Sequence, residues 1–532
     1  MSLNTKSFTN LDIYFEGTIY NKQDFGFEDE FLLLKKLYED ENINFLSKLD
    51  GIFAFCIYDK QKASYFCARD RFGNIPFYYT FYKAKFIFST KIKEILNSLD
   101  YLPNLNKVAL SKYIQFFATF GEDTFYQGIF KLEAANYMLV DKDFNITKKR
   151  YYKIKTYKAV LNEDEALKNI DNILYKSVEK TLSLNSAFLL SGGVDSSFLS
   201  ALYTKISGKK VDTFSLGFDE YKNYCELDFA KITAKHINSN HHEIILNQKE
   251  YINNFYKVLE NFDEPHGDSA AMPLNALLNG VKTALFSNVI SGEGSDELFL
   301  GYDNYAKFIS YYNFNSSLQK EQRDFLDGII QALQNNTKES EYLRRVIKSE
   351  TIYNSFGEIF NFAQKKRLFK NVPTFKLENP KQDCVDWMSY IDLKLWVGNA
   401  VLNKVYSVSS MQNIKVHTPF LNKELVDYLF SIKSAIKVGN TNKYLLKKIA
   451  SKYIPQTIIN RTKKGFNSPY NEWLKQEFKD EILNIILEVN SKTSLFNDSY
   501  IRQIYDLAKQ NKFKQHLYTL FIFSLWYKNH YF

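Results

Sequence analysis

SAFLLSGGVDSSFLSALY, at residues 186–203, predicts a buried strand, a glycine-rich loop and a helix in direct succession. Gly192 and Gly193 carry no Cβ, so the backbone can turn tightly there and approach a ligand closely. The free N–H groups at the start of the following helix would point at this loop and favour an anion such as phosphate. An ordinary glycine turn that caps a helix is the weaker alternative, because a strand precedes the loop and a helix follows it.

Polar side chains of the loop refine this prediction. Ser191, Ser196 and Ser197 add hydroxyl donors, whereas Asp195 would repel phosphate unless a divalent cation lay between them. Mg²⁺ is the expected ion, since it is bound through one or two carboxylates together with phosphate oxygens. The chain has no GxxxxGK[ST] motif, so the P-loop class of nucleotide-binding proteins is not indicated.

From about residue 165 onward, strands and helices alternate. The segments 210–218, 241–246 and 287–291 predict further strands, and helices are expected at 162–182 and 225–237. This alternation predicts a parallel sheet with helices on both faces, and ligands on such sheets bind beyond the carboxyl ends of the strands. The glycine loop falls at that position.

The first part of the chain has a different pattern. The short aromatic and β-branched segments 12–21, 51–59, 63–70 and 85–90 predict antiparallel strands, and one amphipathic helix is expected at 28–49. We therefore expect an α/β fold with an α+β N-terminal part. Its domains would be residues 1–150 and 165–532, joined by a linker.

Composition limits the class of protein. The 532 residues carry a net charge of +9, but lysines are interleaved with Asp and Glu, which disfavours nucleic acid and suits a basic cleft for an anionic substrate. Four cysteines without a CxxC pair fit a reducing cytosol. No signal peptide is recognised, and the apolar run 517–526 is too short for a bilayer and predicts a core helix. A cytoplasmic protein without membrane contact is expected.

Residues 191–197, SGGVDSS, resemble the pyrophosphate-binding loop of the ATP pyrophosphatase superfamily, whose HUP-like domains split ATP into AMP and pyrophosphate to activate a carbonyl group. The resemblance implies ATP contacts in the run from Leu190 through Val194 to Ser197. It also implies one at Leu216, because 213–218 resembles the second nucleotide strand. The loop alone leaves asparagine, GMP, NAD and argininosuccinate synthetases open. A tRNA-thiolating enzyme is disfavoured, because no cysteine pair lies near the loop.

A second loop narrows the choice. Residues 291–299, SGEGSDELF, resemble the GEGSDE loop of asparagine synthetases. The resemblance places Ser291 and Gly292 at ATP, Glu293 near the reacting carbonyl, and Asp296 on a Mg²⁺ ion shared with Asp195. The alternative is that these acidic residues only complement a helix dipole.

Two basic segments extend the resemblance. RTKKGF at 461–466 is similar to the family's R-x-K-x-G-F loop, which implies that Lys463 stabilises phosphate charge during catalysis. TNKYLLK at 441–447 is similar to a T-K-x-x-L-R helix, which implies that Lys443 lies near ATP. A solvated basic loop and a surface helix are the respective alternatives. Residues 263–265 resemble the family's DEP segment. His241 and His242 are adjacent and cannot form HExxH geometry, so structural roles are expected.

The N-terminal part resembles the Ntn-type glutaminase domain of the same family in FEGTIYN (15–21), LDGIFAF (49–55), ARDRFG (68–73) and IPFYY (75–79). The family's glutaminase uses an N-terminal cysteine, whereas this sequence starts Met1-Ser2-Leu3 and has its first cysteine, Cys56, in a predicted core strand.

The same segment departs from the family at two further positions. Glu16 and Thr18 replace an Asn and a Glu of the family. A carboxylate in place of the Asn would oppose oxyanion charge. The expectation is a truncated, degenerate glutaminase kept as scaffold. A mis-annotated start is the competing explanation, and Ser2 is a disfavoured substitute nucleophile.

The acceptor region also departs from the family. Residues 404–407, KVYS, replace the family's K-V-D-R, and residues 417–421, HTPFL, replace its R-x-P-F-L. Losing an Asp and two Arg near a ligand cleft can change the acid accepted, because Arg binds carboxylates bidentately. Aspartate is the default acid.

The resemblance thus implies an ATP-dependent, Mg²⁺-using amide-forming ligase that activates an acid as acyl-AMP for attack by ammonia or an amine. A separate glutaminase partner and a homodimer are left open. One alternative is a specialised amide or lactam synthetase related to β-lactam synthetase. Another is a non-catalytic scaffold, against which the retained Asp195, Glu293, Asp296 and Lys463 speak.

Overall fold

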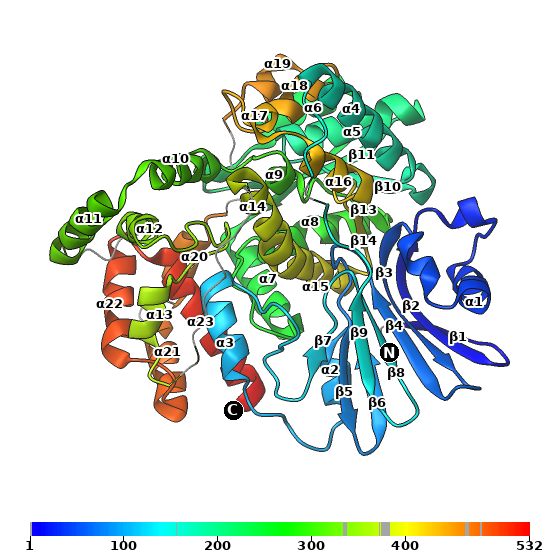
Figure 1. Cartoon of the computed structure of the whole chain (residues 1–532), viewed down its shortest axis with the longest axis horizontal. Coiled ribbons are helices and arrows are strands. Elements are labelled where there is room, and N and C mark those ends of the chain that lie inside the picture. Colours follow the sequence, from blue (N-terminus) through cyan, green and yellow to red (C-terminus); the bar gives the residue numbers. More distant parts are fainter. Residues whose placement is uncertain are drawn as a thin grey trace.

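Two antiparallel sheets form the N-terminal part of the molecule (Figure 1). The computed structural model describes residues 3–155, 157–333, 338–371, 373, 383–462, 468–478 and 481–532. The larger sheet has the order β1-β2-β3-β4-β8-β9, with the strands β1 (Asn4–Ser7), β2 (Leu11–Ile19), β3 (Gly51–Asp59), β4 (Ser64–Arg69), β8 (Asn136–Val140) and β9 (Ile146–Arg150). The smaller has the order β6-β5-β7, with β5 (Tyr78–Tyr82), β6 (Lys85–Ser89) and β7 (Phe130–Lys131).

Strand alternation divides the larger sheet into two apolar faces. Phe53 and Phe55 of β3 pack in one cluster with Leu33 and Leu34 of helix α1 (Glu30–Glu41). Their neighbour Cys56 belongs to a second cluster, with side chains of the smaller sheet. The result is a helix, a six-stranded sheet and a three-stranded sheet in successive layers, as expected for the β-rich N-terminal part.

The prediction of a single helix in this region was wrong. Besides α1, the structure has α2 (Ile92–Leu96) and α3 (Lys107–Phe116). Both are short, and their stability comes from capping and tertiary burial more than from a long amphipathic pattern. The Asn106 side chain accepts hydrogen bonds from the first N–H groups of α3, and Tyr113 is buried in the core of the C-terminal part. The packing core therefore extends across residue 150, the boundary expected between the two domains.

A five-stranded parallel sheet organises the second part of the chain. Its order is β12-β11-β10-β13-β14, with β10 (Ser186–Leu189), β11 (Asp212–Phe218), β12 (Asn240–Leu246), β13 (Asn288–Ile290) and β14 (Lys415–His417). The connecting helices are α4 (Glu163–Glu179), α5 (Val194–Ser207), α6 (Leu227–His236), α7 (Gln248–Asn261), α8 (Ala271–Thr283) and α9 (Ser295–Leu298). The α/β prediction is confirmed. Strand β14 was not anticipated, because three residues are too few for a period-2 pattern.

Helices make up most of the remainder. They are α10 (Asp303–Ser317), α11 (Lys320–Leu333), α12 (Lys338–Ile347), α13 (Phe362–Leu368), α14 (Cys384–Ile391), the π-helix η5 (Asp392–Val401), α15 (Leu402–Gln412), α16 (Lys423–Ser431), α17 (Ser434–Lys437), α18 (Tyr444–Ala450), α19 (Gln456–Ile459), α20 (Tyr470–Phe478), α21 (Glu481–Thr493), α22 (Asp498–Lys509) and α23 (Lys514–Tyr531). The run 517–526 lies within α23 and is buried, as predicted for a core helix. Among the described residues, no helix is both long and apolar enough to cross a bilayer.

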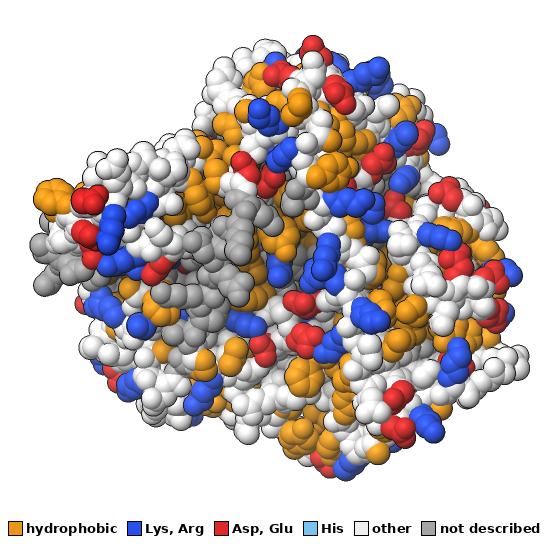
Figure 2. All heavy atoms as spheres, in the orientation of Figure 1, with side chains coloured by type: hydrophobic (Ala, Val, Ile, Leu, Met, Phe, Trp, Pro, Cys, Tyr) orange, Lys and Arg blue, Asp and Glu red, His pale blue; other side chains and the backbone are white. Residues whose placement is uncertain are grey.

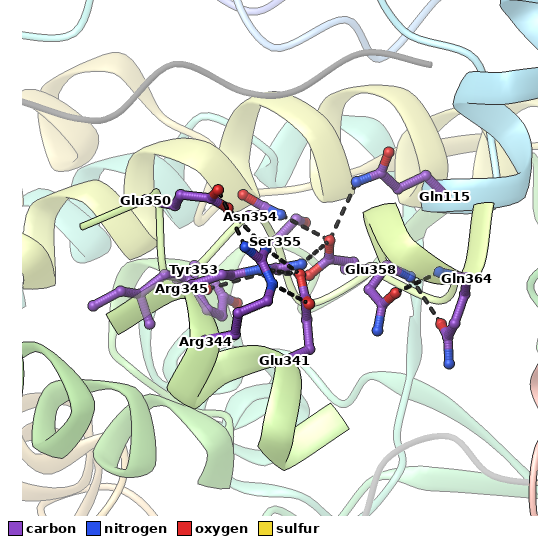
Figure 3. A network of polar contacts seen from close by, with 12 residues as sticks. Gln115, Glu341, Arg344, Arg345, Glu350, Tyr353, Asn354, Ser355, Glu358 and Gln364 are labelled. Atoms are coloured by element: carbon purple, nitrogen blue, oxygen red, sulfur yellow. Dashed lines mark hydrogen bonds and ion pairs between the residues drawn. The ribbon is translucent and has the colours of Figure 1, made fainter. Parts of the chain in front are cut away.

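A buried polar network ties the helical region after α10 to the N-terminal part (Figure 3). Arg345 of α12 pairs with Glu341 at 3.0 Å and with Glu358 at 2.9 Å. Glu358 also accepts a hydrogen bond of 3.2 Å from Gln115 of α3. Although burial by itself raises the pKa of Glu358, the guanidinium of Arg345 keeps this pKa below its usual value. The network fixes the helical region against α3.

Candidate active site

The two glycine-rich loops emerge side by side from the parallel sheet. Strands β10 and β13 are hydrogen-bonded neighbours, with Phe188 opposite Ile290. Because the strands are parallel, residues 191–193 and 291–294 leave the sheet at the same edge. The structure therefore brings together two loops that are 100 residues apart in the sequence.

The first loop requires glycine at one position. Gly192 has a φ of +70°, and a Cβ there would lie 2.5 Å from the backbone nitrogen of Ala230. The hydroxyl of Ser196 accepts a hydrogen bond of 3.1 Å from the Ser191 N–H. Ser197 points elsewhere: its buried hydroxyl lies 2.9 Å from that of Thr233 in α6. In the structure Ser197 thus supports the helix and does not face the loop.

Backbone contacts hold the neighbouring strand to this loop. The Leu190 N–H donates to the carbonyl of Phe214 in β11 at 2.8 Å. Leu216, two residues further along β11, is buried in the core. Any nucleotide contact at Leu190 or Leu216 would thus be made by the main chain beside the loop, and both contacts stay predictions.

Asp195 and Asp296 converge on one cation. The Lys443 ammonium lies 2.7 Å from Oδ1 of Asp296 and also pairs with Oδ2 of Asp195. The Ser295 hydroxyl donates a hydrogen bond of 2.6 Å to the other oxygen of Asp195. Burial alone would lower the pKa of Lys443, but the two carboxylates raise this pKa above its usual value. The two aspartates are therefore close enough to share a single positive charge.

Lys443 reaches this point because the chain around it is sharply bent. It lies just before α18, with a left-handed φ of +54°. Gly301 packs against it: a Cβ on Gly301 would lie 2.0 Å from Oδ1 of Asp296 and 2.4 Å from Cε of Lys443. Lys443 is only 3% exposed, so the alternative of a surface-helix lysine is wrong.

The donor set suits a magnesium ion bound together with a nucleotide. The described residues contain no group of three or more His, Cys, Asp and Glu side chains that could hold a metal. Mg²⁺ needs only one or two carboxylates when phosphate oxygens supply further ligands. Asp195 and Asp296 meet that requirement, since both already contact one cation.

The first residue of the predicted segment 461–466, Arg461, contacts the first glycine loop. Nη1 of Arg461 donates a 2.7 Å hydrogen bond to the Gly192 carbonyl. Its guanidinium lies 4.2 Å from the ring of Phe229 and pairs with Glu226. Lys463, two residues later, lies outside the described residues. The pattern of residues 461–466 gave no signal that Arg461 itself would hold the loop.

A buried ion pair lies near Glu293 of the second loop, where the reacting carbonyl was expected to bind. The Lys404 ammonium is 2.6 Å from Oδ2 of Asp268. Burial works against both charges, yet Lys404 keeps the pKa of Asp268 below its usual value, and the charges of Asp268 and Glu293 raise that of Lys404. Glu293 is half-buried. The charge of Glu293 therefore acts on the Lys404 ammonium.

Burial keeps a histidine beside this ion pair neutral. His266 lies 2.9 Å from the carbonyl of Ala400 through Nε2 and accepts the Asp268 N–H at Nδ1. Burial lowers the pKa of His266 to about 4. The ion pair of Lys404 and Asp268 therefore supplies the charges in this part of the site.

The residues that depart from the family pattern contact one another across the domain interface. The Tyr406 hydroxyl lies 3.0 Å from both carboxyl oxygens of Glu16 and 2.7 Å from the Thr90 hydroxyl. Thr90 itself donates to Glu16 at 2.7 Å. Burial raises the pKa of Glu16, and these hydroxyls partly oppose that rise. Tyr406 is thus turned toward the N-terminal part.

Other polar residues singled out in the sequence bond within the sheets. His241 contacts Thr213 at 2.9 Å and His242 contacts Asp212 at 2.8 Å, both on the neighbouring strand β11. Both histidines therefore bond within the sheet. Cys56 and Cys67 are opposite each other on β3 and β4, with sulfurs 3.3 Å apart. No CxxC spacing exists to reveal that proximity, which depends on strand register.

Comparisons with known proteins identify the family of the chain. The family model described as asparagine synthase matches residues 169–528, and that of the glutamine amidotransferase domain matches residues 4–152. Asparagine synthetase [glutamine-hydrolyzing] 1 of Bacillus subtilis is 28% identical over 97% of this chain and 85% of its own length. A putative asparagine synthetase of Methanocaldococcus jannaschii is 31% identical, over 54% of this chain and 58% of its own.

More distant similarities extend to other proteins. Amidase chry2 of Gibberella zeae is 21% identical over 87% of this chain and 76% of its own length. A glutamine-dependent NAD⁺ synthetase of Acinetobacter baumannii aligns over 48% of this chain and 60% of its own, with 13% identity and a TM-score of 0.21. The asparagine synthase model alone covers well over half of the chain, and the chain therefore belongs to the asparagine synthase family.

Proposed function

We propose that this chain, an ATP-dependent carbon–nitrogen ligase by its family, activates a carboxylic acid as an acyl adenylate and transfers the acyl group to ammonia. The observation that carries the proposal is the convergence of Asp195 and Asp296 on one cation at the edge of a parallel sheet. Such an arrangement suits a metal-bridged triphosphate, and the glycine loop beside it suits the phosphates.

The residues of the site divide the work of binding. The N–H groups and the Ser191 and Ser196 hydroxyls at the start of α5 would face phosphate oxygens. Asp195 and Asp296 would hold Mg²⁺, which when bound neutralises phosphate charge. Lys443 keeps a permanent positive charge beside both carboxylates.

The proposed reaction has two balanced steps. A carboxylate oxygen of the acid attacks the α-phosphorus of ATP, and the bond to the pyrophosphate leaving group breaks. Ammonia then attacks the acyl carbon, AMP leaves, and the nitrogen loses a proton. Glu293 is the residue that we assign to accept this proton, because a half-buried carboxylate beside Lys404 is suited to general-base work.

The N-terminal part supports a nitrogen source other than glutamine. Amide hydrolysis needs hydrogen-bond donors directed at a developing oxyanion. At position 16 the chain has a buried carboxylate whose two oxygens already accept hydrogen bonds from Thr90 and Tyr406. A carboxylate cannot donate in this state, so we assign glutamine hydrolysis no role. Free ammonia, or ammonia from a separate glutaminase, would take its place.

Aspartate is the default acid, but the acceptor side leaves room for another. Tyr406 bonds to Glu16 and His417 bonds to Tyr20, both in the N-terminal part. Neither residue therefore supplies the charge that the family's Asp or Arg would offer at its position. Lys404, paired with Asp268, stays as the charged group near Glu293. This loss of charge favours, as a second candidate, a specialised amide synthetase for a less polar acid.

The test is pyrophosphate release from Mg-ATP with a panel of acids, once with ammonium and once with glutamine. We expect turnover with ammonium only, and no glutamate formed from glutamine. Asp195→Asn should lower turnover by about 10²-fold or more, because it removes a charge from the metal-binding pair. Asp164→Asn, on an exposed position of α4, is the matched control. Equal turnover with glutamine would overturn the ammonia assignment, and unchanged turnover in Asp195→Asn would overturn the ligase site.

A further inference from the structure

A second pocket lies between the two parts of the molecule, apart from the glycine loops. It has a volume of about 430 Å³. The loop after β4, residues 120–121 and 133–135, the end of β9, the linker after it, and the elements α14 and η5 line it. Pockets for small-molecule ligands have volumes of about 300–1,000 Å³, so this one can hold a metabolite.

The pocket carries an excess of positive charge. Arg71, Arg150, Lys153 and Lys394 line it, and Glu133 is the single acidic residue among its lining residues. Arg150 pairs with Glu133 at 3.4 Å. Lys153 and Lys394 are exposed, and within the described part of the chain neither ammonium group has a hydrogen bond or ion pair with another residue. Two uncompensated cations therefore face one cavity, which favours an anion.

Arg71 adds a buried cation to the pocket wall. Its side chain is 8% exposed, and Nη2 donates to the Ser47 carbonyl at 2.9 Å. Its buried Nε has no hydrogen-bond partner among the described residues. Nε is closed to solvent, so an anion in the pocket would not bond to it and would instead be attracted by the charge of the buried guanidinium.

Aromatic side chains form the apolar walls. Phe72, Phe120, Tyr152 and Tyr390 line the cavity. The Phe72 and Tyr152 rings meet edge to face at 6.1 Å, and Arg71 lies 5.8 Å from the Tyr152 ring. Aromatic walls prefer a flat apolar body, so the favoured ligand combines a ring with a negative charge.

One wall of the pocket is an unusual helix. The element η5 has π-helical hydrogen bonding over ten residues. Such segments are rare in proteins, and those that occur often lie at functional sites. Its Gly398 lines the pocket, and a Cβ there would lie 3.1 Å from the Phe72 carbonyl. Trp396 of the same helix donates to Tyr302, which in turn donates to Glu297 beside Asp296. The helix η5 thus lies between the pocket and the second glycine loop, linked to that loop by these two hydrogen bonds.

We propose that this pocket binds a small aromatic anion, a ring that carries a phosphate or a carboxylate, at a site separate from the glycine loops. The cations, with the buried Arg71 guanidinium among them, attract the charge, and the aromatic walls hold the ring. The assignment does not depend on which acid the ligase activates.

Pyridoxal 5′-phosphate is a suitable probe, because its aldehyde condenses with a lysine amine to an imine and water, and borohydride then reduces the imine to a stable amine. All four lysines compared here are exposed, but only Lys153 and Lys394 line the pocket. With the full chain, these two should be modified at about tenfold lower probe concentration than Lys142 and Lys149. Phenyl phosphate or benzoate in excess should protect them, and the better protector identifies the charged group. Peptide mass spectrometry reads out each position.

Variants sharpen the test. Lys394→Ala should weaken modification of Lys153 about tenfold, because it removes one of the two uncompensated charges. The double variant Lys142→Ala/Lys149→Ala changes the net charge by two units elsewhere and should leave modification of Lys153 unchanged. Modification of Lys153 and Lys394 no faster than that of Lys142 and Lys149, or modification that neither phenyl phosphate nor benzoate prevents, would overturn the proposal.

Discussion

The Tyr20 hydroxyl lies 2.9 Å from Nδ1 of His417 and links the N-terminal part to the central sheet. The amide of Asn288 donates to the Leu184 carbonyl, so its oxygen accepts from Nε2–H of His417 at 3.0 Å. Nδ1 is then the acceptor, and Tyr20 is its donor. The carbonyl of His417 in turn accepts the Ser291 N–H at 2.9 Å. The N-terminal part therefore contacts the residue that directly supports the second glycine loop.

Tyr20→Phe should destabilise the protein by about 1–3 kcal/mol, because it leaves the buried Nδ1 of His417 without a donor. Thermal unfolding followed by circular dichroism would measure the loss. Tyr101→Phe, at a side chain that is 54% exposed, should change stability by less than about 0.5 kcal/mol. Equal effects of the two substitutions would show that the Tyr20 contact contributes nothing.

His417 also predicts a dependence of stability on pH. Burial lowers the pKa of His417 to about 3, whereas an unfolded histidine titrates near 6.5. The unfolded chain thus binds the proton first, so this contribution is complete above about pH 6.5 and is lost as the pH falls toward 3. The slope is about 1.4 kcal/mol per pH unit.

The variant His417→Gln isolates this contribution from other titrating groups. Its free energy of unfolding should approach that of the natural protein as the pH falls from 6.5 to 4.5, since glutamine takes up no proton. Urea denaturation of both proteins over that range measures the difference. A gap that stays constant with pH would contradict a neutral buried His417.

Gly301→Ala should abolish most ligase activity while the fold persists. The new Cβ would lie 2.0 Å from Oδ1 of Asp296 and 2.4 Å from Cε of Lys443, so both must move. A displacement of about 1 Å at a catalytic group costs about 10²-fold in rate. Gly328→Ala is the control, since no atom lies within 4 Å of its Cβ position. Pyrophosphate release gives the rate, and full activity in Gly301→Ala would show that the aspartates do not need this packing.

The network around Arg345 predicts a contrast between neighbouring arginines. Arg345→Leu would leave the buried Glu358 without its cation, while Glu341 keeps Arg344, and should cost about 3–5 kcal/mol. Arg344→Leu, whose side chain is 28% exposed and pairs with Glu341 and Glu350, should cost about 0–1 kcal/mol. Chemical denaturation distinguishes the two. Similar losses would mean that burial does not determine the strength of these pairs.

Local patterns predicted the parallel sheet and its two glycine loops. The segment 186–203 has a short apolar run, two glycines and a helical stretch in succession, and each of these is a property of neighbouring residues. The same reasoning was wrong where the local pattern is weak. Helices α2 and α3 and strand β14 are short, and they are stabilised by burial against distant parts of the chain.

The amino-acid sequence alone determined two things about this protein. Local patterns predicted the parallel sheet and its glycine loops, and the resemblance of the loop motifs indicated the family of ligases. Only the tertiary structure decided which groups meet. Glu16 contacts Tyr406 across 390 positions, Lys443 lies between Asp195 and Asp296, and Lys153 and Lys394 share a pocket. The physical reason is that strand order and helix packing bring distant residues together through burial, and no periodicity in the sequence encodes that proximity.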